Sequence, residues 1–297
     1  MQPQRKQLNE GRWHFHYGPI DLVISVDGDA AAIEASLAAC WHRFGEILPE
    51  LVAELNTLRE PLSSSIRVQS PVALRMMRAC WPHRAQFITP MAAVAGAVAD
   101  ELISFFAQVP EITRASINNG GDIGLHLQPG YHYDVGLVTT VASWRKEASS
   151  QAAIDTCGSF RLLAEMPVRG VATSGWRGRS QSLGIADSVT VLAATAAAAD
   201  ASATMIANAV NVTHDAILRV PARQIKDDSD LGDRLVTTSV GSLPPALVTQ
   251  ALQSGAREAQ RCLDEEIIFA AVLCLQGQVA TAGLISHPLS LQWRDAA

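Results

Sequence analysis

Residues 170–210, GVATSGWRGRSQSLGIADSVTVLAATAAAADASATMIANAV, carry the clearest signals of strand, loop and helix in this chain. Residues 185–194 are mostly apolar, are rich in β-branched side chains and have the length of a strand. Residues 196–210 are rich in alanine and contain neither Gly nor Pro, which indicates a helix. We therefore expect a strand that passes directly into a helix, preceded by a polar loop.

Asp200 and Thr204 stand four residues apart in the expected helix, so they share one helix face. A carboxylate and a hydroxyl on the first turns of a helix form an oxygen half-site for Mg²⁺, which completes its coordination shell with water and phosphate. The same spacing fits a helix cap, in which Asp200 complements the helix dipole and Thr204 only packs. The spacing leaves both interpretations open.

The loop before the strand, residues 173–180, contains three hydroxyls, two glycines and two arginines. Glycine allows close approach to the backbone, hydroxyls donate hydrogen bonds, and the planar guanidinium matches phosphate or carboxylate. We expect an anion-binding loop, with a solvated turn as the alternative. The candidate catalytic residues are Thr173, Ser174, Arg177 and Arg179, and the candidate cofactor-binding residues of this loop are Gly175 and Ser180.

A second candidate loop, residues 118–122 (NNGGD), separates two apolar runs at residues 112–117 and 123–127. Turn-forming residues between such runs are typical of a β-hairpin. Bare backbone N–H groups beside polar side chains can also bind a heterocycle or a sugar. The candidate cofactor-binding residues here are Asn119, Gly120, Gly121 and Asp122.

Strand and helix patterns alternate along the rest of the chain, without a repeat or a linker that would mark an internal domain boundary. We expect one α+β unit of mixed and antiparallel sheets with packed helices, and an unstructured tail at residues 1–11. The predicted elements are a hairpin at residues 13–26, a helical run at 30–58 interrupted at Pro49, helix starts at Ser70 and Thr89, short strands at 131–165 with a polar connection at 148–153, a helix at 244–265 and a strand at 267–275.

Composition excludes several classes of protein. The chain has 297 residues, of which 48% are hydrophobic and 18% charged, so it can build a substantial core. A net charge of -6 without a basic run predicts no nucleic-acid partner. Five cysteines without a C-x-x-C pair indicate neither a disulfide framework nor a zinc site, and we expect a reducing cytoplasm. No run of 18 apolar residues occurs, so we expect no membrane partner. The sequence leaves open whether the protein forms a homo-oligomer.

Three motifs of the chain resemble those of the ApbE superfamily, and they occur in the same order. They are NNGGDI at residues 118–123, VATSG at residues 171–175 and ADASAT at residues 199–204. The characterised members of that superfamily are FAD-dependent protein flavin transferases, and the resemblance is strongest to an uncharacterised ApbE-like branch. It implies an α+β fold with FAD lying across a cleft at strand-helix junctions and Mg²⁺ bridging its pyrophosphate.

The resemblance also implies a role for each candidate residue. Asp200 and Thr204 would be metal ligands, with a backbone carbonyl from residues 92–95 as a further ligand. The NNGGDI loop would line the nucleotide or flavin, and Thr173 with Ser174 would lie near the reacting phosphates. Ala95 stands where the transferases carry a lysine, so Arg177 or Arg179 would supply the positive charge.

Three functions are compatible with these residues. The first is a Mg²⁺-dependent enzyme acting on FAD, by transfer of FMN or by cleavage of the pyrophosphate. The second is a hydrolase-like enzyme of small-molecule catabolism that holds a carboxylated heterocycle with Arg177 and Arg179. The third is a flavin-binding or metabolite-binding protein without catalysis.

Overall fold

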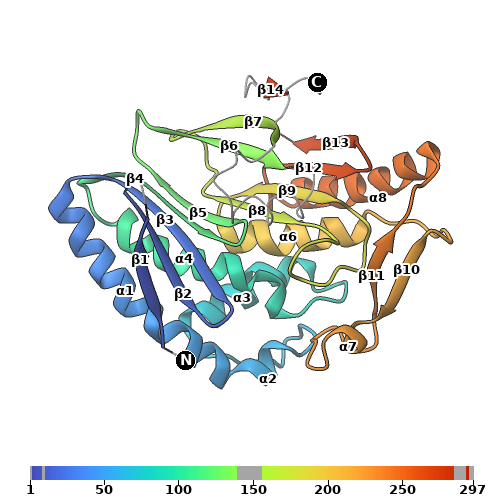
Figure 1. Cartoon of the computed structure of the whole chain (residues 1–297), viewed down its shortest axis with the longest axis horizontal. Coiled ribbons are helices and arrows are strands. Elements are labelled where there is room, and N and C mark those ends of the chain that lie inside the picture. The colour runs from blue at the N-terminus through green and yellow to red at the C-terminus, as the bar shows by residue number, and fades with distance from the viewer. Residues whose placement is uncertain (1, 9–10, 139–155, 284–291, 294–297) are drawn as a thin grey trace. The chain divides into compact units, whose positions relative to one another are not determined.

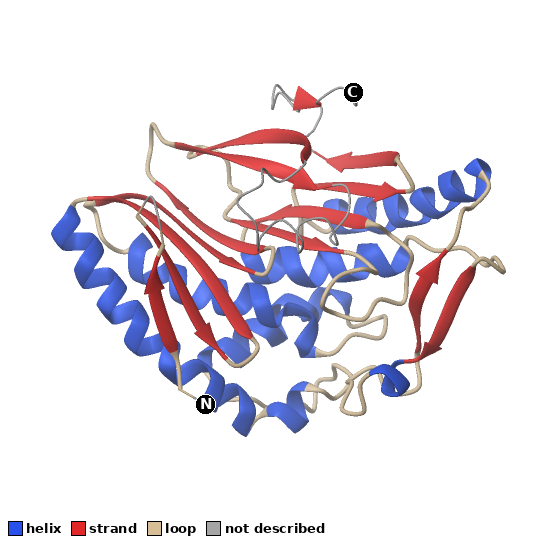
Figure 2. Ribbon diagram, viewed as in Figure 1, coloured by secondary structure: helices blue, strands red, loops and turns tan. Residues whose placement is uncertain are grey.

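The computed structural model describes residues 2–8, 11–138, 156–283 and 292–293 of the chain. These residues form helices and strands, and the strand pairs within each compact unit are antiparallel (Figures 1 and 2). The α+β prediction is confirmed. The polar connection predicted at residues 148–153 lies outside the described residues.

The chain divides into two compact units, each assembled from several segments. The first unit contains Met1–His132, Leu163–Ala172 and Ala193–Ala201, and the second contains the remaining residues. The chain crosses between the units repeatedly, so no single position in the sequence separates them. The expectation of one folding unit stays a prediction.

The first unit contains an antiparallel sheet in the order β1-β2-β3-β4-β5, to which the first residues of β8 are added. The predicted hairpin forms around Gly18, whose φ of 58° suits glycine. The hairpin at the NNGGD loop forms as well, as β4 and β5. The strands are β1 (Gln4–Gln7), β2 (Arg12–Tyr17), β3 (Ile20–Gly28), β4 (Ile112–Asn119), β5 (Asp122–Leu127) and β8 (Gly170–Ser174).

Residues 4–7 form strand β1, so the prediction of an unstructured tail is wrong for them. All four side chains are polar and exposed, which is why the sequence shows no alternating pattern. The strand exists because its backbone pairs with β2, from Gln4 opposite His16 to Gln7 opposite Trp13. Backbone pairing at a sheet edge leaves no signal in the side chains.

Helices α1 (Ala30–Ala53), α3 (Pro71–Cys80) and α4 (Val94–Ala107) accompany this sheet in the first unit (Figure 1). Every second residue of β3 is buried, as expected for a strand that packs one face against helices. The predicted start of α3 is confirmed, because the Ser70 hydroxyl accepts a hydrogen bond from the Ala73 N–H. The start at Thr89 is a 3₁₀ turn, η2 (Pro90–Ala93), before α4 begins.

The predicted interruption at Pro49 is wrong, because α1 continues through this residue to Ala53. A proline inside a helix removes one backbone hydrogen bond. Ile47 and Leu51 on either side of it are buried, and their packing holds the turn in place. Tertiary burial therefore outweighs the local preference.

Residues Pro90–Ala107 are long and apolar enough, by composition alone, to cross a membrane. Half of this stretch is buried inside the protein, where α4 packs on β4, β5 and α1. Burial of this extent is typical of the core helix of a globular protein.

Helix α6 (Ala196–Ala209) begins in the first unit, and its first turn lies directly on α4. A Cβ atom added to Gly96 would lie 2.3 Å from the Ala196 carbonyl oxygen. A Cβ atom added to Gly170 would lie 2.1 Å from the Thr195 oxygen. Both glycines are therefore required by the close approach of this helix start to its neighbours.

The second unit is built on β9 (Ser188–Ala193), β12 (Ala270–Leu275) and β13 (Gln278–Gly283), which are antiparallel neighbours. Helix α8 (Pro245–Asp264) confirms the helix predicted at residues 244–265, and it packs on β12 and β13. A separate hairpin joins β10 (Ile217–Pro221) to β11 (Leu235–Val240), with α7 (Ala222–Ile225) between them. The remaining strands are β6 (His132–Val138), β7 (Thr156–Leu163) and β14 (Gln292–Trp293).

We predict that Gly96→Ala destabilises the protein by roughly 1–3 kcal/mol, because the new methyl group overlaps the α6 backbone. Alanine normally stabilises a helix interior relative to glycine, so the expected sign opposes helix propensity. Gly45→Ala in α1 is the matched control, because the nearest atom to its Cβ would be Pro3 Cγ at 3.9 Å. Urea unfolding measures both variants. Equal or greater stability of Gly96→Ala would contradict the required close approach.

Candidate functional site

In the first unit, α4 and α6 cap each other at their N-terminal ends. Asp100 of α4 accepts hydrogen bonds from the backbone N–H groups of Ala196 and Ala197, both at 2.8 Å. Asp200 of α6 accepts a hydrogen bond from the backbone N–H of Gly96 at 3.0 Å. Each carboxylate thus meets the positive end of the other helix dipole.

The interpretation of Asp200 as the cap of its own helix is wrong. Thr195 performs that role, because its hydroxyl accepts a hydrogen bond from the Ala198 N–H at 3.2 Å. Asp200 lies further along α6 and serves α4 instead. The sequence could not distinguish the two cases, because the partner amide is 104 residues away.

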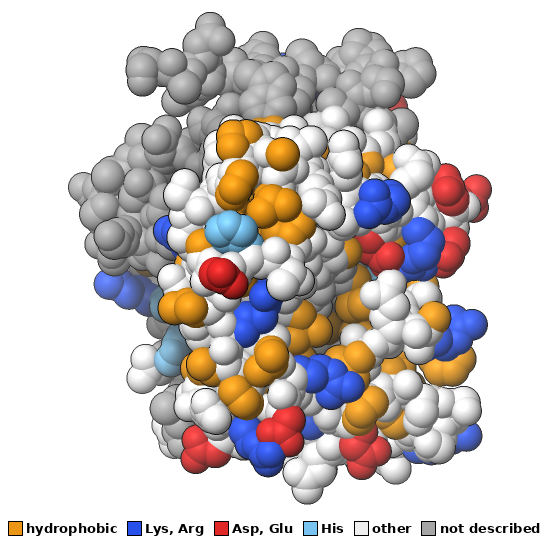
Figure 3. All heavy atoms as spheres, turned by 90° about the vertical axis from the view of Figure 1, so that its right-hand side faces the viewer, with side chains coloured by type: hydrophobic (Ala, Val, Ile, Leu, Met, Phe, Trp, Pro, Cys, Tyr) orange, Lys and Arg blue, Asp and Glu red, His pale blue; other side chains and the backbone are white. Residues whose placement is uncertain are grey.

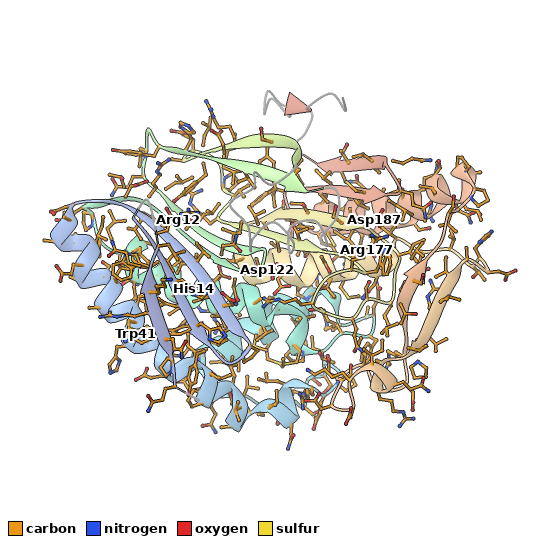
Figure 4. All side chains as sticks on the ribbon, viewed as in Figure 1. Arg12, His14, Trp41, Asp122, Arg177 and Asp187 are labelled. Atoms are coloured by element: carbon orange, nitrogen blue, oxygen red, sulfur yellow. The ribbon has the colours of Figure 1, made fainter. Side chains whose placement is uncertain are left out.

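The NNGGDI loop lies at the start of α4. Asn119 is buried, and its side-chain amide donates a hydrogen bond to the Ala95 carbonyl at 3.1 Å. Gly120 and Gly121 have φ angles of 70° and 116°, which only glycine adopts without strain. No atom lies within 4 Å of a Cβ built on Gly121, so one side of this turn is open. Asp122 follows the turn as the first residue of β5 (Figure 4).

The electrostatics of this cluster are dominated by carboxylates. Burial raises the pKa of Asp200 well above its usual range, and the charge of Asp122 raises it further. Burial also raises the pKa of Asp100 to about 6, although the N–H groups of Ala197 and Ala196 oppose the shift. Among the described residues, no Lys or Arg forms an ion pair with Asp200. Burial and the charge of Asp122 therefore favour the neutral, protonated form of Asp200 in the folded protein.

All three motifs of the sequence contribute residues to this part of the first unit. Ile123 of NNGGDI pairs with Val171 of VATSG across β5 and β8. Gly170 contacts the backbone at Thr195, which opens the helix carrying ADASAT. Asp122 and Asp200 interact electrostatically. Loops that are distant in sequence are thus neighbours in the first unit.

The loop with the two arginines belongs to the second unit. Thr173 at the end of β8 shares a hydrogen bond of 3.0 Å with the Thr190 hydroxyl of β9. Gly175 accepts a hydrogen bond from the Gly178 N–H, which closes a tight turn. Ser174 is half-buried, whereas Arg177, Arg179 and Ser180 are exposed. Thr204, one turn beyond Asp200 on α6, is half-buried as well.

Asp187 holds the arginine loop in place, a role that no sequence pattern indicates. One of its carboxylate oxygens accepts a hydrogen bond from the Trp176 indole N–H at 3.3 Å, and the other accepts one from the Gln276 N–H at 2.7 Å. The Arg177 guanidinium lies 4.7 Å from the Trp176 ring centre (Figure 4). Asp187 therefore orients an indole on which the guanidinium of Arg177 is stacked.

We predict that stability falls as the pH rises from about 4 to about 6.5, because the folded protein holds the Asp100 proton more strongly than the unfolded chain does. The pKa of about 6 exceeds the ordinary value of 3.8, which corresponds to a loss of roughly 3 kcal/mol across this interval. Asp100→Asn should make this part of the profile of unfolding free energy against pH less steep, and Asp200 accounts for the slope that remains. A mutant profile parallel to that of the wild type would contradict the assignment.

The sequence pattern of a family described as AbpE bacteria matches residues 5–281. The UPF0280 protein of Methanothermobacter thermautotrophicus is 39% identical over 164 residues, which are 54% of this chain and 56% of that protein. A UPF0280 protein of Methanococcus maripaludis strain C7 is 36% identical over 134 residues, or 44% of this chain and 49% of that protein. The chain spans about half the length of the curated relatives it matches.

Solved structures with similarity to the chain include the ApbE protein from Thermotoga maritima, at 13% identity and a TM-score of 0.44, covering 97% of this chain and 100% of that one. A mutant of the flavin transferase ApbE from Vibrio cholerae shows 12% identity and a TM-score of 0.46, covering 93% and 98%. Because the family pattern covers nearly the whole length, the chain belongs to the family described as AbpE bacteria.

Proposed function

We propose that this protein is a Mg²⁺-dependent enzyme that binds FAD. It either cleaves the pyrophosphate of FAD or transfers the FMN part to an acceptor. The observation that carries the proposal is the approach of Asp122 to Asp200, which places two of the three motifs in one polar cluster. Membership of the AbpE family supports the same conclusion, since a similar solved protein is described as a flavin transferase.

The residues of this cluster fit a hard cation. Asp200 uses one carboxylate oxygen for Gly96, and a carboxylate has further lone pairs for a metal. Thr204 offers a hydroxyl on the next turn of the same helix. Asp200 and Thr204 would hold Mg²⁺, which would polarise the phosphate oxygens. Asn119, Gly120, Gly121 and Asp122 would line the nucleotide or flavin.

The arginine loop supplies the chemistry that a pyrophosphate requires. Arg177 and Arg179 are exposed cations, and Arg177 is held in one orientation by Trp176. We assign to these arginines the stabilisation of negative charge that develops on the phosphates. They would take the role of the lysine that the transferases carry at the position of Ala95. Thr173, Ser174, Gly175 and Ser180 would donate hydrogen bonds to the same oxygens.

The reaction that these groups support is displacement at the flavin-side phosphorus. The oxygen of water or of an acceptor hydroxyl forms a new bond to that phosphorus, and the bond from phosphorus to the bridging oxygen breaks. AMP leaves with the bridging oxygen, and the attacking hydroxyl releases its proton. The products are AMP together with FMN or an FMN-linked acceptor.

A second candidate function is the binding of a carboxylated heterocycle for hydrolysis. The stacked and exposed Arg177 favours it, because a planar guanidinium held on an indole binds carboxylate as readily as phosphate. Binding of carboxylated heterocycles in preference to FAD would select this function. Tight flavin binding without product formation would instead indicate a protein that binds but does not catalyse.

We predict that Asp200→Asn weakens Mg²⁺-dependent FAD binding by at least about tenfold while the fold persists, because the amide oxygen can still accept the Gly96 hydrogen bond. Asp200→Ala removes this capping interaction and should cost roughly 0.5–2 kcal/mol of stability. Isothermal titration with FAD, with and without Mg²⁺, measures binding, and chromatography of FMN and AMP measures turnover. Asp215→Asn, at an exposed position of the second unit, is the control.

The outcome that would end the proposal is a folded wild-type protein that neither binds FAD nor forms FMN and AMP in the presence of Mg²⁺. Binding that Asp200→Asn leaves unchanged would retain the flavin and remove Asp200 from the metal site.

We predict that Trp176→Leu weakens FAD binding by about 2–5-fold, because stacking of an exposed guanidinium on an indole contributes about 0.5–1 kcal/mol. Trp81→Leu is the matched control, since Arg84 lies at the same 4.7 Å from the Trp81 ring centre, in a different part of the chain. The same titration compares the two variants. Equal losses in both would show that the effect of Trp176 is not specific.

A further inference from the structure

The hairpin of β10 and β11 in the second unit contains two buried polar atoms that have no partner. They are Nε of Arg219 and the hydroxyl oxygen of Thr237, and they are the two such side-chain atoms among the described residues. Arg219 and Thr237 are directly opposite each other in the register of the hairpin, so their side chains share one face. Two unpartnered hydrogen-bonding groups therefore converge on one place.

The groups around this pair are already committed to each other. The Nη2 of Arg219 donates to the Asn211 amide oxygen at 2.5 Å, and the Asn211 amide donates to the Leu183 carbonyl at 3.3 Å. The backbone N–H of Thr237 donates to the Ser182 carbonyl at 2.8 Å. A loop, the end of α6 and the hairpin are thus joined by hydrogen bonds that leave Nε and the hydroxyl without an acceptor.

A partner that brings both an acceptor atom and negative charge would match this pair. Among the described residues, no carboxylate forms an ion pair with Arg219, and burial lowers the pKa of its guanidinium. A guanidinium Nε and a hydroxyl together match the oxygens of a carboxylate or a phosphate. Thr237 is 6% exposed, whereas Arg219 is half-buried, so a small anion can reach the pair from the side of the arginine.

We propose that Arg219 and Thr237 form a binding site for a small oxyanion. The anion accepts hydrogen bonds from Nε of Arg219 and from the Thr237 hydroxyl, and it neutralises the guanidinium. This site uses none of the candidate catalytic residues and does not depend on the proposed function. Figure 3 shows the side of the molecule that carries this hairpin, where Lys and Arg side chains lie among hydrophobic, neutral and acidic ones.

The test uses the full chain, titrated with inorganic phosphate or with acetate at an ionic strength held constant with NaCl. We expect one of the two anions to raise Tm by about 2–5 °C at ten times its Kd. Arg219→Gln and Thr237→Val should each lose this shift and weaken binding by about tenfold or more. Thr238→Val, at an exposed neighbouring position, and Arg257→Gln, at an exposed position of α8, should retain it.

Thr237→Val also gives a result that a purely structural role would not produce. In NaCl alone it should be as stable as the wild type or more stable, because it removes a buried hydroxyl without a partner. With the anion present, the wild type should be more stable than Thr237→Val. A wild type that gains nothing from either anion would show that water satisfies these atoms and would overturn the proposal.

A gain that disappears in Arg177→Gln but persists in Arg219→Gln and Thr237→Val would place the anion in the arginine loop and would also overturn it. Failure of FAD binding would leave this result unaffected, because the titrated anions are not flavins. Preference for phosphate or for acetate identifies which oxyanion the site takes.

Discussion

The first unit depends on the reciprocal capping of α4 and α6 by Asp200 and Asp100. Each helix begins against the other, at a separation that glycine at position 96 permits and alanine would not. Four backbone N–H groups at each helix start need acceptors, and here half-buried carboxylates supply some of these acceptors. The arrangement fixes where α6 begins, and therefore where Asp200 lies relative to the NNGGDI turn. The geometry of the proposed metal site is thus a consequence of how two helices satisfy their ends.

This solution has an electrostatic cost that points to function. Loss of hydration raises the pKa values of Asp100 and Asp200, and for Asp200 the charges of Asp122 and Asp100 raise the pKa further. A neutral hydroxyl can accept such a hydrogen bond without these shifts, as Thr195 does for α6. Acidic side chains with raised pKa values are typical of sites that bind a cation or activate a ligand.

The sequence predicts most of the elements because their signals are local. The strand before α6, the NNGGD hairpin and the Ser70 cap follow from periodicity, turn residues and capping chemistry. The errors have non-local causes. The backbone pairing of β1 leaves no side-chain pattern, and the packing around Pro49 outweighs its local preference. For the site, Asp122 and Asp200 could be recognised as candidates from their residue types and motifs. The capping role of Asp100 and the hydrogen bond between Asp187 and Trp176 depend on tertiary contacts, which the sequence does not show.

Arginine side chains in this chain differ in how completely their N–H groups are hydrogen-bonded. The guanidinium of Arg169 in the first unit donates hydrogen bonds to three backbone carbonyl oxygens, and it stabilises the local fold. Arg177 is instead supported from behind by an indole and presents its N–H groups outward, and Arg219 keeps its Nε buried without an acceptor. A guanidinium that folding leaves incompletely bonded, while its position is fixed by neighbours, is prepared for an anion, since the ordering cost is met before the ligand arrives. The state of bonding, rather than the residue type, distinguishes Arg177 and Arg219, to which we assign anion binding, from the structural Arg169.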